Sequence, residues 1–423
     1  MFYDYLKKEL GINPEVCDLV MEAERDLEAR FKEIDEIGAI CQAKVLSSCA
    51  NNRLSDTHFN ISTGYGMHDE GRDVTEAIFA SIFEAEAALV RPQLVSGTHA
   101  LAAAMFGNLR PGDTLFSPVG KPYDTLEYVI GIRESSGSLA DFGVKYAQVD
   151  LDENGEIDYL SIRKALASKP KMATIQRSKG YSLRKSFMVA EIRELIKLIR
   201  EVSPETIILV DNCYGEFTDV VEPIEADLIV GSLMKNPGGG HVMGGGYVAG
   251  KRKYVKDAAT RFTAPGISDS VGPTFGFTRS VIQGLFVSPQ VVAGAVKGAV
   301  LAARVFSKLG FEVAPLTEEP RSDIVQAIKL KNRENMLKFC RGIQKASPID
   351  AYVTPEPCEM GGYAHQVIMA GGTFVQGSTI ELSADGPIRE PYAVYMQGGL
   401  TAAHSKLGII YALNEMGILG DTK

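Results

Sequence analysis

The residues TIILVDNCYGEFTDVVEPIEADLIVGSLMKNPGGG, positions 206–240, decide the fold class of this chain. They contain two short apolar runs, Thr206–Val210 and Leu228–Val230, separated by turn residues and acids. Uninterrupted apolar runs of this length are typical of parallel strands that are buried on both faces. Asp211 follows the first run directly, and Lys235 follows the second after a short turn. Because the carboxyl ends of parallel strands meet at one edge of a sheet, we expect Asp211 and Lys235 to lie close together.

The same alternation of apolar runs and longer helical segments extends from about residue 75 to 300, which predicts a mainly parallel sheet with crossover helices. Beyond about residue 310, strand-like and helix-like pieces come in mixed order. We therefore predict a helical N-terminal arm (1–70), a large α/β domain (71–310) and a smaller α+β C-terminal domain (311–423). The other predicted strands are Gln93–Ser96, Thr114–Ser117 and Met172–Ile175, and the predicted helices are Ala100–Phe106 and Val189–Val202.

Composition narrows the function classes. The net charge of the 423 residues is −9, and Lys and Arg are scattered, so we expect no nucleic-acid partner. The apolar stretch from Val281 to Phe306 contains charged residues and a proline, so we expect a packed helix there and no membrane span. The six cysteines include no C-x-x-C pair, and the N-terminus lacks a signal-peptide pattern. We expect reduced thiols, a cytoplasmic location and no metal site.

The polar residues that follow the predicted strands form a chemically coherent set. Ser96-Gly97-Thr98-His99 opens an Ala-rich helix, whose free backbone N–H groups favour an anion such as phosphate. Gln176 follows the run MATI. Pyridoxal 5'-phosphate (PLP) needs an amine that forms an imine, an acid at the ring nitrogen and a phosphate cradle. Lys235 would supply the amine and Asp211 the acid, and we expect burial and neighbouring cations to lower the pKa of Lys235.

Five segments carry a resemblance to a known family, namely RPQLVSGTHA, GKPYDTL, IILVDNCYGEF, DLIVGSLMKNPGGG and SADGPIREPYAVYMQGG. Their content and order resemble the fold type I PLP-dependent enzymes, and among them the methionine gamma-lyase-like or cystathionine beta-lyase-like group called aluminium resistance proteins. The resemblance covers nearly the whole chain from about Tyr65 onward. It implies an aspartate-aminotransferase-like α/β fold with PLP as cofactor.

The resemblance also implies roles for individual residues in this sequence. Asp211 and Lys235 match the two defining positions of the family, and Tyr123 resembles the aromatic residue that stacks on the cofactor and belongs to the catalytic set. The other implied cofactor contacts are Gly97, Thr98 and Ser232 at the phosphate, His99 as a second stacking ring, and Gln176 and Tyr214 at the phenolic oxygen. A plain helix-capping or packing role remains open for His99.

Three further residues are implied at the edge of the site. Arg389 resembles the arginine that binds the substrate α-carboxylate, and a surface ion pair with Glu390 or Asp385 is its alternative. Tyr65 and Arg72 are similar to residues that related lyases contribute to a neighbouring subunit's phosphate site, and a solvated charge cluster is the alternative for Arg72. The implied assembly is a homodimer or homotetramer with shared active sites.

The activity implied by the resemblance is that of a PLP-dependent carbon–sulfur lyase. Its small-molecule substrate would be a sulfur-containing amino acid such as cystathionine, cysteine or methionine. Imine formation, removal of the α-proton by Lys235 and β- or γ-elimination would yield a 2-oxo acid and ammonia. Asp211 and Lys235 alone would equally serve an aminotransferase, a racemase or an aldolase. A non-catalytic stress-tolerance protein that retains the cofactor is the alternative outside enzymes.

Overall fold

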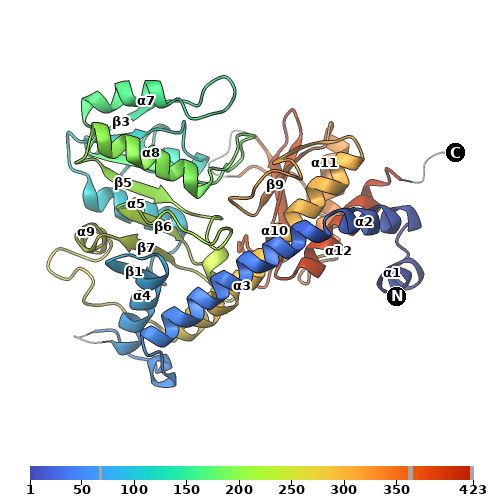
Figure 1. The fold of residues 1–423 in the computed structure, drawn as a ribbon, viewed down its shortest axis with the longest axis horizontal. Coiled ribbons are helices and arrows are strands. Elements are labelled where there is room, and N and C mark those ends of the chain that lie inside the picture. Colours follow the sequence, from blue (N-terminus) through green and yellow to red (C-terminus); the bar gives the residue numbers. More distant parts are fainter. Residues whose placement is uncertain (66–68, 361–364, 420–423) are drawn as a thin grey trace.

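The computed structural model of the 423-residue chain describes residues 1–65, 69–360 and 365–419. These residues form a large, mainly parallel sheet and a smaller antiparallel sheet, which lie in different parts of the molecule (Figure 1). All strands of the large sheet precede residue 251, and all strands of the small sheet follow residue 311. The fold class is therefore α/β with a smaller α+β part, as predicted.

The large sheet has seven strands in the order β1-β7-β6-β5-β4-β2-β3. Strand β7 runs antiparallel to both of its neighbours, and the other four strand pairs are parallel. The strands are β1 (Ala87–Arg91), β2 (Thr114–Ser117), β3 (Lys145–Gln148), β4 (Met172–Gln176), β5 (Ile207–Asp211), β6 (Leu228–Ser232) and β7 (Gly246–Gly250).

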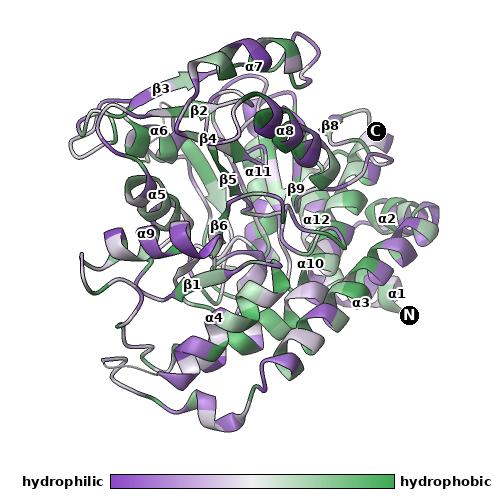
Figure 2. Cartoon of the chain, turned by 60° about the vertical axis from the view of Figure 1, so that its left-hand side comes forward, coloured by the Kyte–Doolittle hydropathy of each residue, from purple (hydrophilic) through white to green (hydrophobic). Residues whose placement is uncertain are grey.

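Both faces of this sheet are covered by helices, which explains the uninterrupted apolar runs. Along β5, Ile207 and Leu209 join one core cluster, whereas Ile208 and Val210 join another, because successive side chains point to opposite faces. One face packs against α5 (Gly97–Asn108) and α9 (Arg252–Phe262), and the other against α4 (Glu70–Ile82) and α8 (Val189–Val202). Figure 2 shows β4 and β5 in the hydrophobic colour between these layers.

The small sheet has five antiparallel strands in the order β10-β11-β12-β9-β8. Helices α11 (Arg333–Lys345) and α12 (Ala402–Met416) pack together, and α11 covers β10 and β11. The strands are β8 (Glu312–Ala314), β9 (Val325–Lys329), β10 (Val367–Ala370), β11 (Ser383–Pro387) and β12 (Ala393–Gln397).

Helix α10 (Phe277–Lys308) connects the two sheets and is 32 residues long. Its length and composition would suffice for a membrane span, but 78% of its apolar window is buried inside the protein. The N-terminal helix α3 (Glu28–Asn51) lies along α10 (Figure 1). The remaining helices are α1 (Phe2–Glu9), α2 (Pro14–Asp26), η1 (Asp56–Phe59), α6 (Asp124–Ile130), α7 (Tyr159–Ala165), η2 (Leu166–Ser168) and η3 (Asn236–Gly238).

One predicted strand is wrong. Gln93–Ser96 forms a turn, and the strand of this region is β1 at Ala87–Arg91. Arg91 is buried in that strand, where its guanidinium pairs with Glu76 at 2.8 Å. Arg91 at the end of the strand and Glu86 just before it interrupt the apolar pattern of β1. The apolar pair Leu94-Val95 in the following turn therefore resembles a strand more closely than β1 does.

Candidate active site

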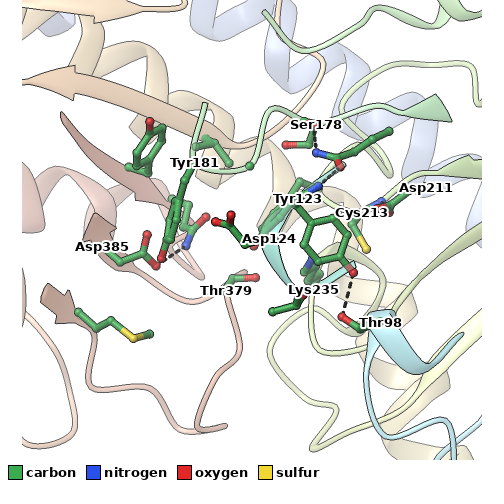
Figure 3. Close-up of a pocket in the computed structure, with 18 residues that line it drawn as sticks. Thr98, Tyr123, Asp124, Ser178, Tyr181, Asp211, Cys213, Lys235, Thr379 and Asp385 are labelled. Carbon is green, nitrogen blue, oxygen red and sulfur yellow. Dashed lines mark hydrogen bonds between the residues drawn. The ribbon is translucent and has the colours of Figure 1, made fainter. Parts of the chain in front are cut away.

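The predicted strand ends meet in one cavity of about 310 Å³ (Figure 3). Gln176 and Asp211 are the last residues of β4 and β5 and lie opposite each other in the parallel register. Lys235 follows β6 by three residues and lines the same cavity. Residues of the small sheet close the cavity on its other side. The wall includes Thr98, Tyr123, Asp124, Tyr181, Cys213, Tyr214, Val325, Met369, Thr379, Asp385, Tyr395 and Gln397.

Lys235 is held over an aromatic ring at the start of η3. Its Nζ atom lies 4.0 Å from the ring centroid of Tyr214, within range of a cation–π interaction. Tyr214 has a φ of +70°, a conformation that is costly for a residue with a side chain and that often marks a functional site. Asn236 fixes this loop, because its side-chain amide donates to the backbone oxygens of Tyr214 and Glu216 at 2.9 and 2.8 Å.

The pKa of Lys235 differs from our expectation. Burial acts to lower it, but the Asp211 carboxylate, together with Cys213 and Tyr214 whenever those groups are ionised, acts in the opposite direction, and the pKa lies well above its usual value. Among the described residues, burial and negative charge are the largest influences on this pKa, rather than the expected neighbouring cations. The amine is therefore held as an ammonium group in the protein alone.

Asp211 is the buried carboxylate that faces this ammonium. One oxygen accepts a hydrogen bond of 3.1 Å from the backbone N–H of Cys213. Burial raises the pKa of Asp211, and the positive charge of Lys235 partly opposes that rise. A buried acid beside a cation is suited to hold a positively charged ring nitrogen, because the attraction is strong where water is excluded.

The N-terminus of α5 provides a cradle for an anion. Ser96 caps the helix by accepting the His99 backbone N–H at 3.1 Å, and the N–H groups of Gly97 and Thr98 have no acceptor among the described residues. A Cβ atom at Gly97 would lie 3.1 Å from the Cβ of Ser232 and 3.3 Å from the Sγ of Cys213. Glycine thus lets the helix end approach β6 closely, and both features suit a phosphate group.

His99 does not line the cavity. Its ring accepts the backbone N–H of Val95 at 3.3 Å and packs edge-on against Phe262 at 6.0 Å. This placement agrees with the packing role that the sequence left open.

Tyr123 and Gln176 form a connected pair in the cavity wall. The Tyr123 hydroxyl lies 2.8 Å from the Thr98 hydroxyl oxygen. The backbone N–H of Tyr123 donates to the side-chain oxygen of Gln176 at 2.8 Å. The Gln176 amide group donates to the backbone oxygen of Ser178 at 2.8 Å. Gln176 therefore positions the loops on both sides of it, and its predicted contact with a phenolic oxygen stays a prediction.

Arg389 does not line the main cavity. It is exposed in the turn between β11 and β12 and lines an adjoining cavity of about 470 Å³. The two cavities share Tyr123, Asp124, Gln176 and Tyr181. A substrate carboxylate bound by Arg389 would therefore have to lie where the two cavities join, and its role stays a prediction.

Tyr65 and Arg72 also lie outside the cavity wall. The side chain of Tyr65 is 86% exposed. Arg72 is buried and donates to the backbone oxygens of Gly64 at 3.0 Å and Ser270 at 3.1 Å. Within one chain Arg72 joins two loops, and the predicted contact of both residues with a neighbouring subunit stays a prediction.

The small sheet contributes residues to the cavity that the sequence pattern did not assign to the site. Asp385 and Tyr395 lie directly opposite each other on β11 and β12, and both line the cavity. Tyr181 approaches from the loop after β4, and Figure 3 shows it beside Asp385. An acid inside the strand-like segment STIELSADGP was the available signal for Asp385, because a lone buried acid requires an explanation.

The residues that are present fit PLP. The cavity combines a lysine amine, a buried acid, a tyrosine ring and the free N–H groups of a helix N-terminus. These are the groups that this cofactor needs. Together with the mainly parallel sheet, they match the fold and the site of the PLP-dependent enzymes of fold type I. The PLP-dependent protein YhfS from Escherichia coli shares this fold with a TM-score of 0.61 at 16% identity.

The chain belongs to the methionine gamma-lyase family, whose model matches residues 16–417. It is 49% identical to the uncharacterized protein YnbB of Bacillus subtilis (strain 168), over 94% of this chain and 95% of that protein. A crystal structure from Clostridium acetobutylicum, provisionally named as a cystathionine beta-lyase involved in aluminum resistance, has a TM-score of 0.94 and 49% identity, covering 97% and 98% of the two chains. A carbon-sulfur lyase involved in aluminum resistance from Clostridium novyi NT has a TM-score of 0.93 and 47% identity, with the same coverage.

Proposed function

We propose that this protein is a PLP-dependent carbon–sulfur lyase. Its substrates would be sulfur-containing amino acids such as cystathionine, cysteine or methionine, and its products a thiol, a 2-oxo acid and ammonia. The main observation behind the proposal is that Lys235 and Asp211 follow adjacent strands and line the same cavity. The family of the chain and the name of the Clostridium novyi relative support a lyase.

Each group of the cavity has a defined task in this proposal. The cofactor, when bound, supplies an electron sink for bonds that break at the substrate α-carbon. Lys235 would hold the cofactor covalently through Nζ and, once released by the substrate amine, would take the α-proton. Asp211 would hold a proton at the ring nitrogen. A positive charge at the ring nitrogen would compensate the negative charge of Asp211, which is one of the groups that raise the pKa of Lys235, so that pKa would fall and the amine could act as a base.

The remaining residues would bind and orient. The backbone N–H groups of Gly97 and Thr98 would donate to the phosphate, with the Ser232 hydroxyl beside them. The Tyr123 ring would cover the cofactor, and its hydroxyl, held by Thr98, would be placed to pass a proton to the leaving sulfur. Tyr214 would reach the phenolic oxygen of the cofactor.

The absorption spectrum of purified wild type beside Lys235→Ala tests the cofactor part. We expect a visible cofactor band in wild type that is lost in the variant, with the fold unchanged by circular dichroism. The reaction is tested by measuring 2-oxo acid, thiol and ammonia from an amino-acid panel. An aminotransferase would form a 2-oxo acid without ammonia, and a non-catalytic protein would form none of the three products. A wild-type protein that binds no PLP would overturn the proposal.

We further propose that the active unit is a homodimer or homotetramer with shared sites in the cytoplasm, where the six free cysteines would stay reduced. Tyr65 is the proposed contribution to the neighbouring subunit. Mixing Tyr65→Ala with Lys235→Ala subunits tests this, because hybrids carry one site with neither change. Recovered activity supports shared sites, whereas independent sites predict no recovery.

A further inference from the structure

Asp385 is a buried acid in the cavity wall that the proposed chemistry does not use. It lies on β11 with 7% of its surface exposed, and its Oδ1 atom has no hydrogen-bond partner among the described residues. The Oδ2 atom accepts a long hydrogen bond of 3.4 Å from the side chain of Gln397, and Tyr181 also hydrogen-bonds the carboxyl group. Asp385 lines the cavity, and its Oδ1 atom is buried with its hydrogen-bonding capacity unused, so a ligand group that reaches this atom would satisfy it.

Within the described ranges, Asp385 forms no salt bridge, whereas the other two acids of this wall each lie beside a cation. Asp124 pairs with Arg133 at 2.8 Å, and Asp211 faces Lys235. Burial raises the pKa of Asp385 to about 7. The hydrogen bond with Tyr181 opposes this rise in pKa. A buried carboxylate without a cation is costly, and a bound cation would remove that cost.

Two aromatic rings stand beside this carboxyl group. Tyr395 lies directly opposite Asp385 in the antiparallel register, so both side chains project from the same face of the small sheet. The ring of Tyr181 lies 5.2 Å from that of Tyr395, tilted by 35°. Aromatic faces attract cations through their negative π surface, so the rings and the acid favour the same kind of ligand group.

We propose that Asp385, Tyr181 and Tyr395 form a subsite for a positively charged group at the far end of the substrate side chain. This inference rests on the proposed function, in which Lys235 and the cofactor bind the α-amino end on the opposite wall. It selects among the proposed substrates, because cystathionine carries a second ammonium group in its side chain and cysteine and methionine do not.

Binding of lysine and norleucine to the PLP-loaded enzyme tests the subsite. The two amino acids have side chains of similar length, one ending in an ammonium and the other in a methyl group, and neither has a leaving group. By calorimetry, we expect wild type to bind lysine about tenfold to a hundredfold more tightly, the usual strength of a charge-assisted hydrogen bond in a dry site. Asp385→Asn should remove this preference and leave norleucine binding within about threefold.

Two further variants control for folding and for general charge effects. Tyr395→Leu keeps the acid and removes one ring, so it should weaken lysine binding alone and by a smaller factor. Glu334→Gln removes a surface acid of the same part of the chain, whose side chain is 74% exposed, and should keep the full preference. Equal affinity of wild type for both ligands, binding of neither ligand, or equal losses of both in Asp385→Asn would each overturn the proposal.

A turnover measurement separates this inference from the proposed function. S-(2-aminoethyl)cysteine and S-propylcysteine differ in the same way as lysine and norleucine but carry a leaving thiol. A lyase with the subsite should release ammonia faster from the cationic compound, and Asp385→Asn should abolish that difference. If neither compound releases ammonia while lysine still binds more tightly than norleucine, the lyase proposal fails and the subsite stands.

Discussion

The buried acid Asp385 should make the stability of this protein depend on pH in a specific way. Its pKa is raised from 3.8 to about 7 in the folded chain, so the native state keeps a proton that the unfolded state has released. The contribution of Asp385 to the free energy of unfolding is therefore fully present below about pH 4 and is lost as the pH rises to about 7. A rise of about three pKa units, at about 1.4 kcal/mol each, makes the full loss about 4 kcal/mol.

Asp385→Asn should remove this loss, because the amide is uncharged at every pH. Its carbonyl can replace the oxygen that accepts from Gln397, and its NH₂ group can occupy the open Oδ1 position. Between pH 5 and pH 8, the stability of the variant relative to wild type should grow by about 2–3 kcal/mol. For 423 residues, whose unfolding entropy is about 0.9 kcal/mol per kelvin, that growth corresponds to about 3 °C in Tm.

Thermal unfolding at pH 5, 6, 7 and 8 measures this difference. The comparison of variant with wild type at each pH cancels the titration of other buried acids such as Glu216, whose pKa burial raises to about 8. Glu334→Gln serves as the control and should follow wild type throughout. A Tm difference between Asp385→Asn and wild type that stays constant from pH 5 to pH 8 would show that the pKa of Asp385 is not raised in the folded chain.

Three further predictions concern the proposed cofactor site and the buried ion pair between Arg177 and Glu222, which lies outside the cavity wall. Asp211→Asn should keep the visible cofactor band but slow release of 2-oxo acid about 10²- to 10⁴-fold, because the acid at the ring nitrogen is lost; unchanged turnover would contradict the role of Asp211. Arg177→Met should lower the free energy of unfolding, measured in urea, by about 3–5 kcal/mol. The reason is that the buried Glu222 carboxylate, which lies 3.4 Å from the Arg177 guanidinium, loses its cation. The double variant Arg177→Met with Glu222→Gln should recover part of that loss. Gly97→Ala should weaken PLP binding in equilibrium dialysis by about tenfold, because overpacking of about 1–3 kcal/mol falls at the phosphate cradle, and equal PLP affinity would show that the cradle lies elsewhere.

Several elements were predictable from local pattern. Helix α8 begins and ends where the sequence predicted, at Val189 and Val202, because its apolar spacing is regular and Ser203-Pro204 ends it. Strands β4, β5 and β6 were found as apolar runs, since parallel strands buried on both faces need apolar residues at every position. The placement of Asp211 and Lys235 in one cavity followed from the general geometry of parallel sheets.

Other features depend on contacts between residues far apart in the sequence. Strand β1 was misplaced because it pairs with β7, about 160 residues later, and its buried Arg91 is compensated by Glu76 of another element. The pKa of Lys235 was predicted to fall, but its direction depends on which charges the fold brings near it. Neither the partner strand of β1 nor the charges around Lys235 can be predicted from the residues next to them in the sequence.

The sequence by itself determined the α/β class, the lysine and acid at the strand ends, and the cofactor that they suit. Each of these depends on residue type and on spacing within one strand-to-helix unit, which short-range geometry converts directly into position. The three-dimensional packing was needed to show that Asp385 and Tyr395 complete the cavity, that Arg389 lies beside it, and that His99 does not line it. Those positions follow from how a second sheet docks against the first, and docking is set by the packing of the whole core rather than by any one segment.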